Sequence, residues 1–386
     1  MSGARRGVAV IGAGVVVEQR HLPALLASGR GVPAAIFDPD RGRAQTLAER
    51  FSIPFVAESL AAAVAVDSAE AALIASPNSF HRAGVEAALA RGLHVLCEKP
   101  MALNLPDARA MAEAGRAAGR TLRIGFAQRF SSEHRCAARL LESGVLGRVH
   151  AFHGVISEPI DVVPGGAANY RFNAAQGGGL TLIDVGSHRI DQTRALFGEV
   201  EEVYAEMASV LPGHDLDDSV SLSLRLRGGA VGTLAFHRFS RAYFSPWTVL
   251  GTKAVMNFSA AIVNPYQSAP LAVFLEEPPE RALPPDLLPW TRPQGWWGET
   301  PAGWTSLWPP REDAFVRQWE AFFDAVDGRA SGAATADDGC RALEIVLAAY
   351  ESARTRKPVS LPLDSSVDPT PPSFERNLCQ NPVGST

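Results

Sequence analysis

Two charged residues, Glu98 and Lys99, follow directly on a short apolar run at residues 94–97. The run is typical of a buried strand, and Pro100 ends it because proline has no amide hydrogen to donate to a sheet. Open parallel sheets bind their ligands at the carboxyl ends of the strands, so a lysine at this edge can reach a reacting atom. A surface salt bridge at a strand end is the simpler alternative.

A second candidate group lies in residues 180–191, which follow three successive glycines. If this segment is helical, Asp184 and His188 lie four residues apart on one face, with Asp191 a further turn along. Such a carboxylate can orient the imidazole, which exchanges a proton near neutral pH. The alternatives are a buried histidine satisfied by its neighbour, or half of a metal site. We expect no metal, because no further cluster of His, Cys or acidic residues completes a ligand set.

A glycine-containing turn follows the first apolar strand, residues 7–11. A strand, a glycine turn and a helix in this order suit a dinucleotide, whose pyrophosphate binds the free amides at the helix N-terminus. We expect Gly12, Gly14 and Val15 to contact it. The third glycine of the usual fingerprint is replaced by Val17, which should separate helix and strand slightly or shift the helix start. A simple strand-to-helix turn is the alternative.

The second apolar strand, residues 33–37, ends in Asp38, which is 24 residues beyond Gly14. This offset is close to that of the acid that binds the ribose hydroxyls of NAD. A carboxylate here repels a 2′-phosphate, so NAD is favoured, although Arg41 and Arg43 could serve the phosphate of NADP. The alternative for Asp38 is a turn residue.

Apolar runs at residues 71–75 and 121–126 alternate with helical patterns at residues 83–91 and 106–118. Regular alternation of strands and helices predicts a parallel sheet with right-handed crossovers.

Polar residues leave the strand at 71–75, and Ser76, Pro77 and Asn78 are candidates for contact with the cofactor ribose or amide. His81 is a further candidate for the cofactor site, but we favour a role in capping or packing the next helix.

The composition excludes several classes of protein. The chain has 386 residues and a net charge of −5, with no clustered excess of Lys and Arg, so a nucleic-acid partner is not expected. No stretch approaches the roughly 20 apolar residues of a membrane helix. The cysteines have no paired spacing, which favours reduced thiols in a cytoplasm. They are Cys97, Cys136, Cys340 and Cys379.

The pattern of apolar and polar residues changes after residue 126. A short helix around residues 137–141 precedes a strand at 149–156, and residues 201–258 alternate apolar and polar side chains, as at 219–226. This alternation predicts an antiparallel sheet with one face solvated or covered by a partner.

Residues 259–311 are rich in proline and hold five of the seven tryptophans. We expect an irregular loop, which is either a lid over a carbohydrate or packed against the protein or another subunit. Helices are predicted at 314–326 and 337–355, and a polar tail follows.

Taken together, these motifs resemble the glucose-fructose oxidoreductase and inositol dehydrogenase family (Gfo/Idh/MocA) over nearly the full length. The matching pieces are Ile11-Gly12-Ala13-Gly14, His21-Leu22-Pro23-Ala24-Leu25, Ser76-Pro77-Asn78, His81, Glu98-Lys99-Pro100, Gly177-Gly178-Gly179, Asp184-Val185-Gly186-Ser187-His188, Asp337-Asp338-Gly339 and Ala348-Ala349-Tyr350-Glu351-Ser352.

The resemblance implies an α/β fold: a Rossmann doubly wound parallel sheet, then an α+β domain with an open, largely antiparallel sheet. We expect these domains at residues 1–126 and 127–362, with a tail at 363–386. The sheet's open face implies a homodimer or homotetramer.

The same resemblance assigns the site residues. It implies that Lys99, Asp184 and His188 form the catalytic group and contact substrate. It places Glu98 and Gln128 at the cofactor, and Arg129, Tyr170 and Arg171 near substrate or nicotinamide.

These features predict an oxidoreductase that passes a hydride between a nicotinamide cofactor and a ring hydroxyl or ketone of a sugar, amino sugar, nucleotide sugar or cyclitol. His188 or Lys99 would handle the hydroxyl proton. Two alternatives remain open. One is a glycosidase that uses NAD for a transient oxidation, and the other is a regulator that senses a dinucleotide or sugar without turnover.

Overall fold

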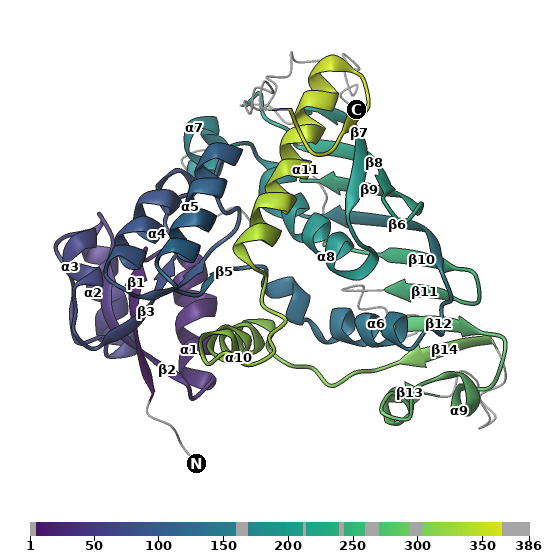
Figure 1. Ribbon diagram of the computed structural model, residues 1–386, viewed down its shortest axis with the longest axis horizontal. Coiled ribbons are helices and arrows are strands. Elements are labelled where there is room, and N and C mark those ends of the chain that lie inside the picture. Colours follow the sequence, from purple (N-terminus) through teal and green to yellow (C-terminus); the bar gives the residue numbers. More distant parts are fainter. Residues whose placement is uncertain are drawn as a thin grey trace, which may run out of the picture.

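The structure is a computed structural model, and it describes residues 5–159, 169–210, 214–238, 243–258, 270–292 and 303–364. Two sheets organise these residues. A sheet of 5 strands lies on one side of the molecule and a sheet of 10 strands on the other, with helices between them (Figure 1).

The first sheet is entirely parallel, with strand order β2-β1-β3-β4-β5. Its strands are β1 (Arg6–Ile11), β2 (Gly31–Phe37), β3 (Ala69–Ile74), β4 (His94–Cys97) and β5 (Leu122–Ile124). Its helices are α1 (Leu22–Ala27), α2 (Arg41–Phe51), α3 (Leu60–Val64), α4 (His81–Ala90) and α5 (Leu105–Ala117). Because helices cover both faces, the strands are almost continuously apolar. The predicted Rossmann-type sheet is confirmed.

A connecting region leads from β5 to the second sheet. It consists of the 3-10 helix η3 (Ala127–Phe130), α6 (Ser132–Glu142), β6 (Val149–Ser157), the 3-10 helix η6 (Tyr170–Phe172), α7 (Ala174–Gly177), the π-helical turn η7 (Leu182–Gly186) and α8 (Ser187–Phe197). The predicted helical segment at 180–191 is therefore present, but its first part is a π-helical turn.

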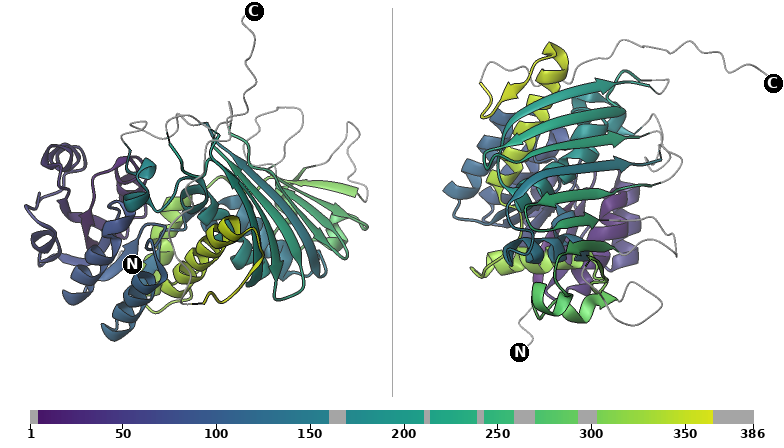
Figure 2. Two further views of the ribbon diagram at one scale, coloured as in Figure 1. Left: turned by 90° about the horizontal axis from the view of Figure 1, so that it is seen from above. Right: turned by 90° about the vertical axis from the view of Figure 1, so that its right-hand side faces the viewer.

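The second sheet is antiparallel throughout its named pairs except between β6 and β9, which run parallel. Its other strands are β7 (Val200–Ala208), β8 (Ser219–Leu226), β9 (Val231–His237), β10 (Trp247–Gly251), β11 (Val255–Phe258), β12 (Leu271–Leu275), β13 (Thr291–Arg292), β14 (Gly303–Leu307) and β15 (Val359–Ser360). The strict alternation of buried and exposed residues in β8 agrees with its predicted half-buried strand. Helices cover one face of this sheet and leave the other open (Figure 2).

The prediction of an irregular loop at 259–311 is wrong for the described part of that region. Strands β12, β13 and β14 extend the sheet there, with α9 (Pro279–Ala282) and the 3-10 helix η8 (Leu288–Trp290) between them. Sequence reasoning missed these strands because they are short and separated by prolines.

The tryptophans of this region have different environments. Trp290 packs against the core, whereas Trp304 is 40% exposed and its ring meets that of Phe274 edge-on. Strand β14, which carries Trp304, lies far from β3 and β5, the strands that pair with β4 on either side (Figure 1). Trp296 and Trp297 lie outside the described residues.

Helix α10 (Ala314–Val326) returns from the second sheet to the first and packs against α1. Its aromatic face, Trp319, Phe322 and Phe323, is buried in one cluster with the strands β1 and β2. Arg30, just before β2, donates to Asp324 of α10 at 2.7 Å. The first unit is thus completed by a helix that comes late in the chain.

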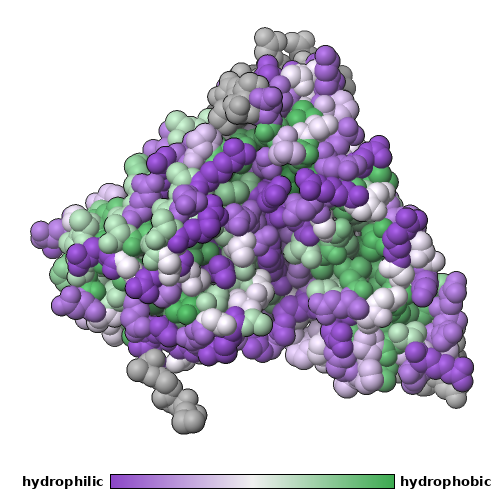
Figure 3. Space-filling model, viewed as in Figure 1, coloured by the Kyte–Doolittle hydropathy of each residue, from purple (hydrophilic) through white to green (hydrophobic). Residues whose placement is uncertain are grey.

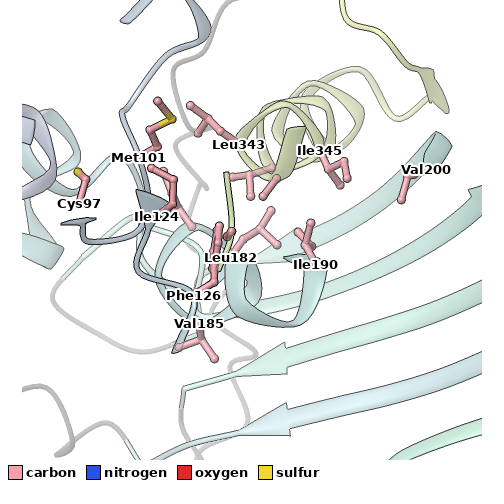
Figure 4. Packing of buried hydrophobic residues seen from close by; sticks show 14 of the residues in the cluster. Cys97, Met101, Ile124, Phe126, Leu182, Val185, Ile190, Val200, Leu343 and Ile345 are labelled. Carbon is pink, nitrogen blue, oxygen red and sulfur yellow. The ribbon is translucent and has the colours of Figure 1, made fainter. Parts of the chain in front are cut away.

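Helix α11 (Ala336–Thr355) passes from the first unit to the second (Figure 1). Thr335 and Asp338 form a capping box at its start, which satisfies amides that the helix itself leaves unpaired. Apolar residues of α11, including Leu343 and Ile345, share one core with Cys97 and Ile124 of the first sheet and with Leu182 (Figure 4). The two units are therefore packed together around the segment that carries the candidate site.

The surface mixes polar and apolar residues. Hydrophilic side chains follow α11 on the face drawn in Figure 3, and hydrophobic ones gather toward β10 and β11. Among the described residues, no helix has the length and apolar character needed to cross a membrane.

The aromatic face of α10 gives a test of the fold. Truncation of the fully buried Trp319 to Ala should lower the free energy of unfolding by about 3–5 kcal/mol, because a large cavity opens beneath β1 and β2. The matched control is Trp308→Ala, since Trp308 is 42% exposed. Urea unfolding of both variants measures the difference, and equal losses would contradict this packing.

Candidate active site

The segment after β4 lies where the sequence predicts it. The strand ends at Cys97, and Glu98 and Lys99 follow at the carboxyl edge of the parallel sheet. The strand is buried because β3 and β5 pair with it on either side. Its rigid position fixes the direction in which Lys99 leaves the sheet.

Lys99 reaches across to the second unit. Its Nζ donates to Oδ1 of Asp184 at 2.7 Å and to the backbone carbonyl oxygen of Asp184 at 2.9 Å. The two side chains are only 11% and 14% exposed, so little water screens the ion pair. The structure therefore brings together two of the three residues predicted to form the catalytic group.

Two arginines share the other oxygen of Asp184. Arg171, from η6, donates from Nε to Oδ2 at 2.9 Å, and Arg238, just after β9, donates from Nη2 to the same atom at 2.5 Å. Burial by itself would raise the pKa of Asp184, but Lys99 and the two guanidinium groups hold that pKa well below its ordinary value. Asp184 is consequently a carboxylate at any pH near neutrality.

His188 is not paired with Asp184, so the expected orientation of its imidazole by that carboxylate is wrong. No hydrogen bond joins the two side chains, and Nδ1 of His188 is buried without a partner. The intervening π-helical turn changes the spacing of side chains from that of an α-helix, and three cations already occupy the carboxylate. The His188 ring instead meets Phe126 edge-on.

The surroundings of His188 keep it uncharged. Burial and then the charge of Lys99 lower the pKa of His188 to about 3. A neutral imidazole has a free lone pair on one nitrogen and can accept a proton, whereas an ammonium group can only donate.

The helix that carries Asp184 and His188 is fixed by Asp217, a residue that sequence reasoning missed. The fully buried carboxylate of Asp217 accepts from the backbone amides of Leu180, Thr181 and Leu182 at 2.7–3.1 Å. These amides begin the helical segment and would otherwise lack partners. The only signal in the sequence is the group of acidic residues just before β8, and such residues are equally typical of a turn.

The glycines before this helix permit close contacts. Gly179 has a φ of +133°, and a Cβ there would lie 2.0 Å from the Tyr350 hydroxyl. Gly178 has a φ of +80°, and its Cβ would meet Leu103 at 2.6 Å. Larger residues would push the helix away from α11 and the first unit.

The carboxylate of Glu98 is paired with a histidine. Its Oε1 lies 2.8 Å from Nε2 of His21, and its Oε2 accepts from the backbone amide of Lys99 at 3.1 Å. Although burial opposes ionisation, His21 and then Lys99 lower the pKa of Glu98 below its ordinary value. This contact ties the end of β4 to the helix that follows the glycine turn, and a role of Glu98 toward a cofactor stays a prediction.

The glycine turn after β1 has the shape of a dinucleotide cradle. Gly12 has a φ of +108°, and a Cβ there would lie 2.5 Å from the Ala75 carbonyl oxygen, while nothing lies within 4 Å of a Cβ on Gly14. Asp38 accepts from the amide of Ala13 at 2.7 Å, so its carboxylate lies against the turn.

Val15 is 44% exposed above the same turn. The disturbance expected from Val17 takes the form of a π-helical turn, Val17–His21, with the Val17 side chain fully buried.

The residues after β3 connect the first sheet to neighbouring segments of the chain. Nδ2 of Asn78 donates to the Gly177 carbonyl oxygen at 2.8 Å, which joins the first unit to the glycine run. His81 is 1% exposed, and its two ring nitrogens lie 2.9 Å from the carbonyl oxygens of Ser76 and Pro100. A packing role for His81, as we favoured, fits these contacts. The Ser76 hydroxyl is buried without a partner, and Pro77 precedes a 3-10 turn at 78–80.

The remaining predicted residues lie around the same helix. Arg129 makes a bidentate pair with Asp191, with both contacts at 2.6 Å, and Gln128 accepts from Gln192 through its backbone oxygen. The Arg171 guanidinium stacks over the Tyr170 ring, 4.9 Å from its centre. Arg129 is thus engaged in holding α8, whereas Tyr170 and Arg171 lie at Asp184. Contacts of all four residues with ligands remain predictions.

Sequence reasoning missed Arg238, Glu158 and His21 as partners in the site. Glu158 follows β6, and its Oε2 lies 3.9 Å from Nη2 of Arg238. No periodic pattern marks these residues, since strand pairing brings the ends of β6 and β9 together. Within the described ranges, no group of three or more His, Cys, Asp or Glu residues is placed to hold a metal ion.

A glycine turn that suits a dinucleotide and a cluster of charged side chains from two units define a Rossmann-fold protein with a composite site. The model of the oxidoreductase family with an NAD-binding Rossmann fold matches residues 6–126, and that of the GFO/IDH/MocA C-terminal domain matches residues 134–257. The chain therefore belongs to the GFO/IDH/MocA oxidoreductase family, which confirms the resemblance drawn from its motifs.

Relatives of known name share part of the chain. Inositol 2-dehydrogenase of Streptomyces avermitilis is 36% identical over 199 residues, covering 50% of this chain and 53% of that protein. D-xylose 1-dehydrogenase (NADP(+)) 2 of Haloferax volcanii is 34% identical over 196 residues, covering 51% and 58%. The chain thus spans a little over half the length of these relatives.

Solved structures share the fold over more of the chain. Levoglucosan dehydrogenase in complex with NADH and levoglucosan is 22% identical with a TM-score of 0.78, covering 93% of this chain and 100% of that one. Aldose-aldose oxidoreductase from Caulobacter crescentus complexed with glycerol is 25% identical with a TM-score of 0.74, covering 93% and 100%.

The glycine run gives a test of how the helix is placed. Gly179→Ala should lower the melting temperature markedly more than Gly198→Ala. Both glycines have positive φ, but a Cβ at Gly198 has nothing within 4 Å, whereas one at Gly179 collides with Tyr350. Differential scanning calorimetry compares the two variants, and equal decreases would mean that the collision plays no part.

Proposed function

We propose that this chain transfers a hydride between a nicotinamide cofactor and a ring carbon of a sugar, amino sugar, nucleotide sugar or cyclitol. The observation that carries the proposal is the contact of Lys99 with Asp184 at the carboxyl edge of the parallel sheet, next to an uncharged His188. Relatives named as dehydrogenases of inositol and D-xylose support a polyhydroxylated ring as substrate.

The cradle around Gly12 and Gly14 fits a dinucleotide. Open space above Gly14 would let a pyrophosphate approach the backbone, and the Asp38 carboxylate, which lies against the turn, would accept hydrogen bonds from ribose hydroxyls. That negative charge disfavours a 2′-phosphate, so we propose NAD as the cofactor, with NADP as the alternative. When bound, the nicotinamide ring supplies or takes up the hydride.

Different residues of the protein would then act on the oxygen and on the proton of the substrate hydroxyl. The Lys99 ammonium, held by Asp184, stabilises negative charge as it develops on the substrate oxygen. The neutral imidazole of His188 accepts the hydroxyl proton during oxidation and returns it during reduction. Arg171 and Tyr170, beside Asp184, would bind the remaining hydroxyl groups.

We further propose a homodimer or homotetramer that pairs through the open face of the second sheet. Exposed apolar side chains on that face, Val231, Phe274 and Trp304, support a protein partner there.

A cytoplasmic location agrees with the free thiols of Cys97 and Cys136.

The role of Lys99 is tested by substitution. A panel of sugars, nucleotide sugars and cyclitols is offered to the purified chain with NAD and with NADP, and nicotinamide absorbance at steady state identifies the substrate. On that substrate, Lys99→Met should reduce turnover by about a hundredfold or more. Lys253→Met is the control, because Lys253 is exposed and the pairing of β10 with β6 puts it beside the start of β6, at the opposite end from Glu158. Unchanged turnover in Lys99→Met would contradict the proposed role of Lys99.

The environment of His188 predicts the pH profile. The pKa of His188 is lowered to about 3, and protonation below that pKa would remove its lone pair. The value of kcat/KM for oxidation should therefore show no acid limb near 6.5, the ordinary histidine value. Steady-state rates between about pH 5 and pH 8 check this. A limb near 6.5 that disappears in His188→Asn would show that the imidazole is charged at rest.

A further inference from the structure

Arg238 lies deeper in the site than any other arginine that contacts Asp184. Its side chain is 4% exposed, compared with 26% for Arg171. Its Nη2 contacts Oδ2 of Asp184 at 2.5 Å and lies 3.9 Å from Oε2 of Glu158. Its Nε is buried without a partner, and Asp184 is the carboxylate that its guanidinium contacts more closely.

The backbone of Arg238 is fixed by the neighbouring strand. Its amide donates to the carbonyl oxygen of Asp218 at 2.9 Å. Asp218 is buried and directly follows Asp217, whose carboxylate caps the helix that carries Asp184. The beginning of β8 and the end of β9 therefore hold both the helix and the side chain of Asp184.

The titratable and charged groups around Asp184 come from five elements. They are Glu98 and Lys99 after β4, Glu158 after β6, Tyr170 and Arg171 on η6, Arg238 after β9, and His188 on the helix of Asp184 itself. Lys99 uses one carboxylate oxygen and the arginines use the other, so the arginines decide how the carboxylate is turned. Of these arginines, Arg171 is the more exposed and the less constrained.

We propose that Arg238 is a positioning residue, which acts through Asp184 by keeping its carboxylate charged and turned so that Oδ1 stays on Lys99. The inference rests on the proposed function, in which the Lys99 ammonium must face the substrate oxygen. At 4% exposure, the Arg238 side chain offers almost no surface to a substrate or cofactor, so its effect on the reaction would pass through Asp184.

The test compares Arg238→Met, which fills similar space without charge, with Arg238→Lys, which keeps the charge. On the substrate found by the panel, Arg238→Met should lower kcat about tenfold or more while KM changes less. Arg238→Lys should retain most of the natural kcat, because its ammonium group keeps a positive charge beside Oδ2 of Asp184. Arg354→Gln, at an exposed pair with Glu351, is the control and should change neither kcat nor KM.

A second measurement needs no substrate. Melting temperatures are compared for Arg238→Met in the natural chain and in an Asp184→Asn background. If Arg238 acts through Asp184, its substitution lowers the melting temperature clearly less when Asp184 is already Asn. If Arg238→Met does not fold, Arg238→Gln replaces it in both measurements.

Three results would overturn the proposal: an unchanged kcat in Arg238→Met, an equal decrease of kcat in Arg238→Lys, or a decrease in melting temperature in the Asp184→Asn background as large as the decrease in the natural chain. A failure of the proposed function gives a different pattern. No sugar would then be turned over, while the melting-temperature comparison would still test whether Arg238 acts through Asp184.

Discussion

The carboxylate of Asp184 is the point on which the rest of the site depends. It accepts hydrogen bonds from Lys99, Arg171 and Arg238, which come from the end of a strand of the first sheet, a 3-10 helix and the end of a strand of the second sheet. Removing one partner of a buried ion pair typically costs about 3–5 kcal/mol, because the remaining charge is left unpaired. A single side chain thus couples the geometry of the two units.

This arrangement separates the roles of two residues that lie near each other. Asp184 keeps Lys99 in place and leaves His188 without a carboxylate partner, so one group stays positively charged and the other neutral. Oxidation of an alcohol needs both a proton acceptor and a stabilised oxyanion. The π-helical turn between Asp184 and His188 contributes to this separation, since a regular α-helix would place the imidazole next to the carboxylate.

Much of the fold could be predicted from local patterns. Continuous apolar runs located the parallel strands, and Pro100 located the end of the strand that delivers Lys99. Strict alternation located β8. The short strands β12 to β14 escaped because each offers too few residues for a periodic signal, and the prolines between them favour a loop.

The site was predictable only in part, for a physical reason. Lys99, Asp184 and His188 belong to motifs that are read along the chain, whereas Arg238 and Asp217 act through strand pairing and a helix cap. Those contacts depend on how β8 and β9 end beside the helix. Nothing in the residues around Arg238 distinguishes it from the many surface arginines, so its role emerges only from the three-dimensional structure.

In the proposed mechanism, the Lys99–Asp184 pair and His188 surround the reacting carbon. A crystal structure of the chain with NADH bound tests it most directly. We expect the nicotinamide ring at the carboxyl end of β4, facing both Lys99 and His188, with the Lys99–Asp184 contact intact. A nicotinamide ring that faces away from both side chains, or an Asp184 that has left Lys99, would contradict the account.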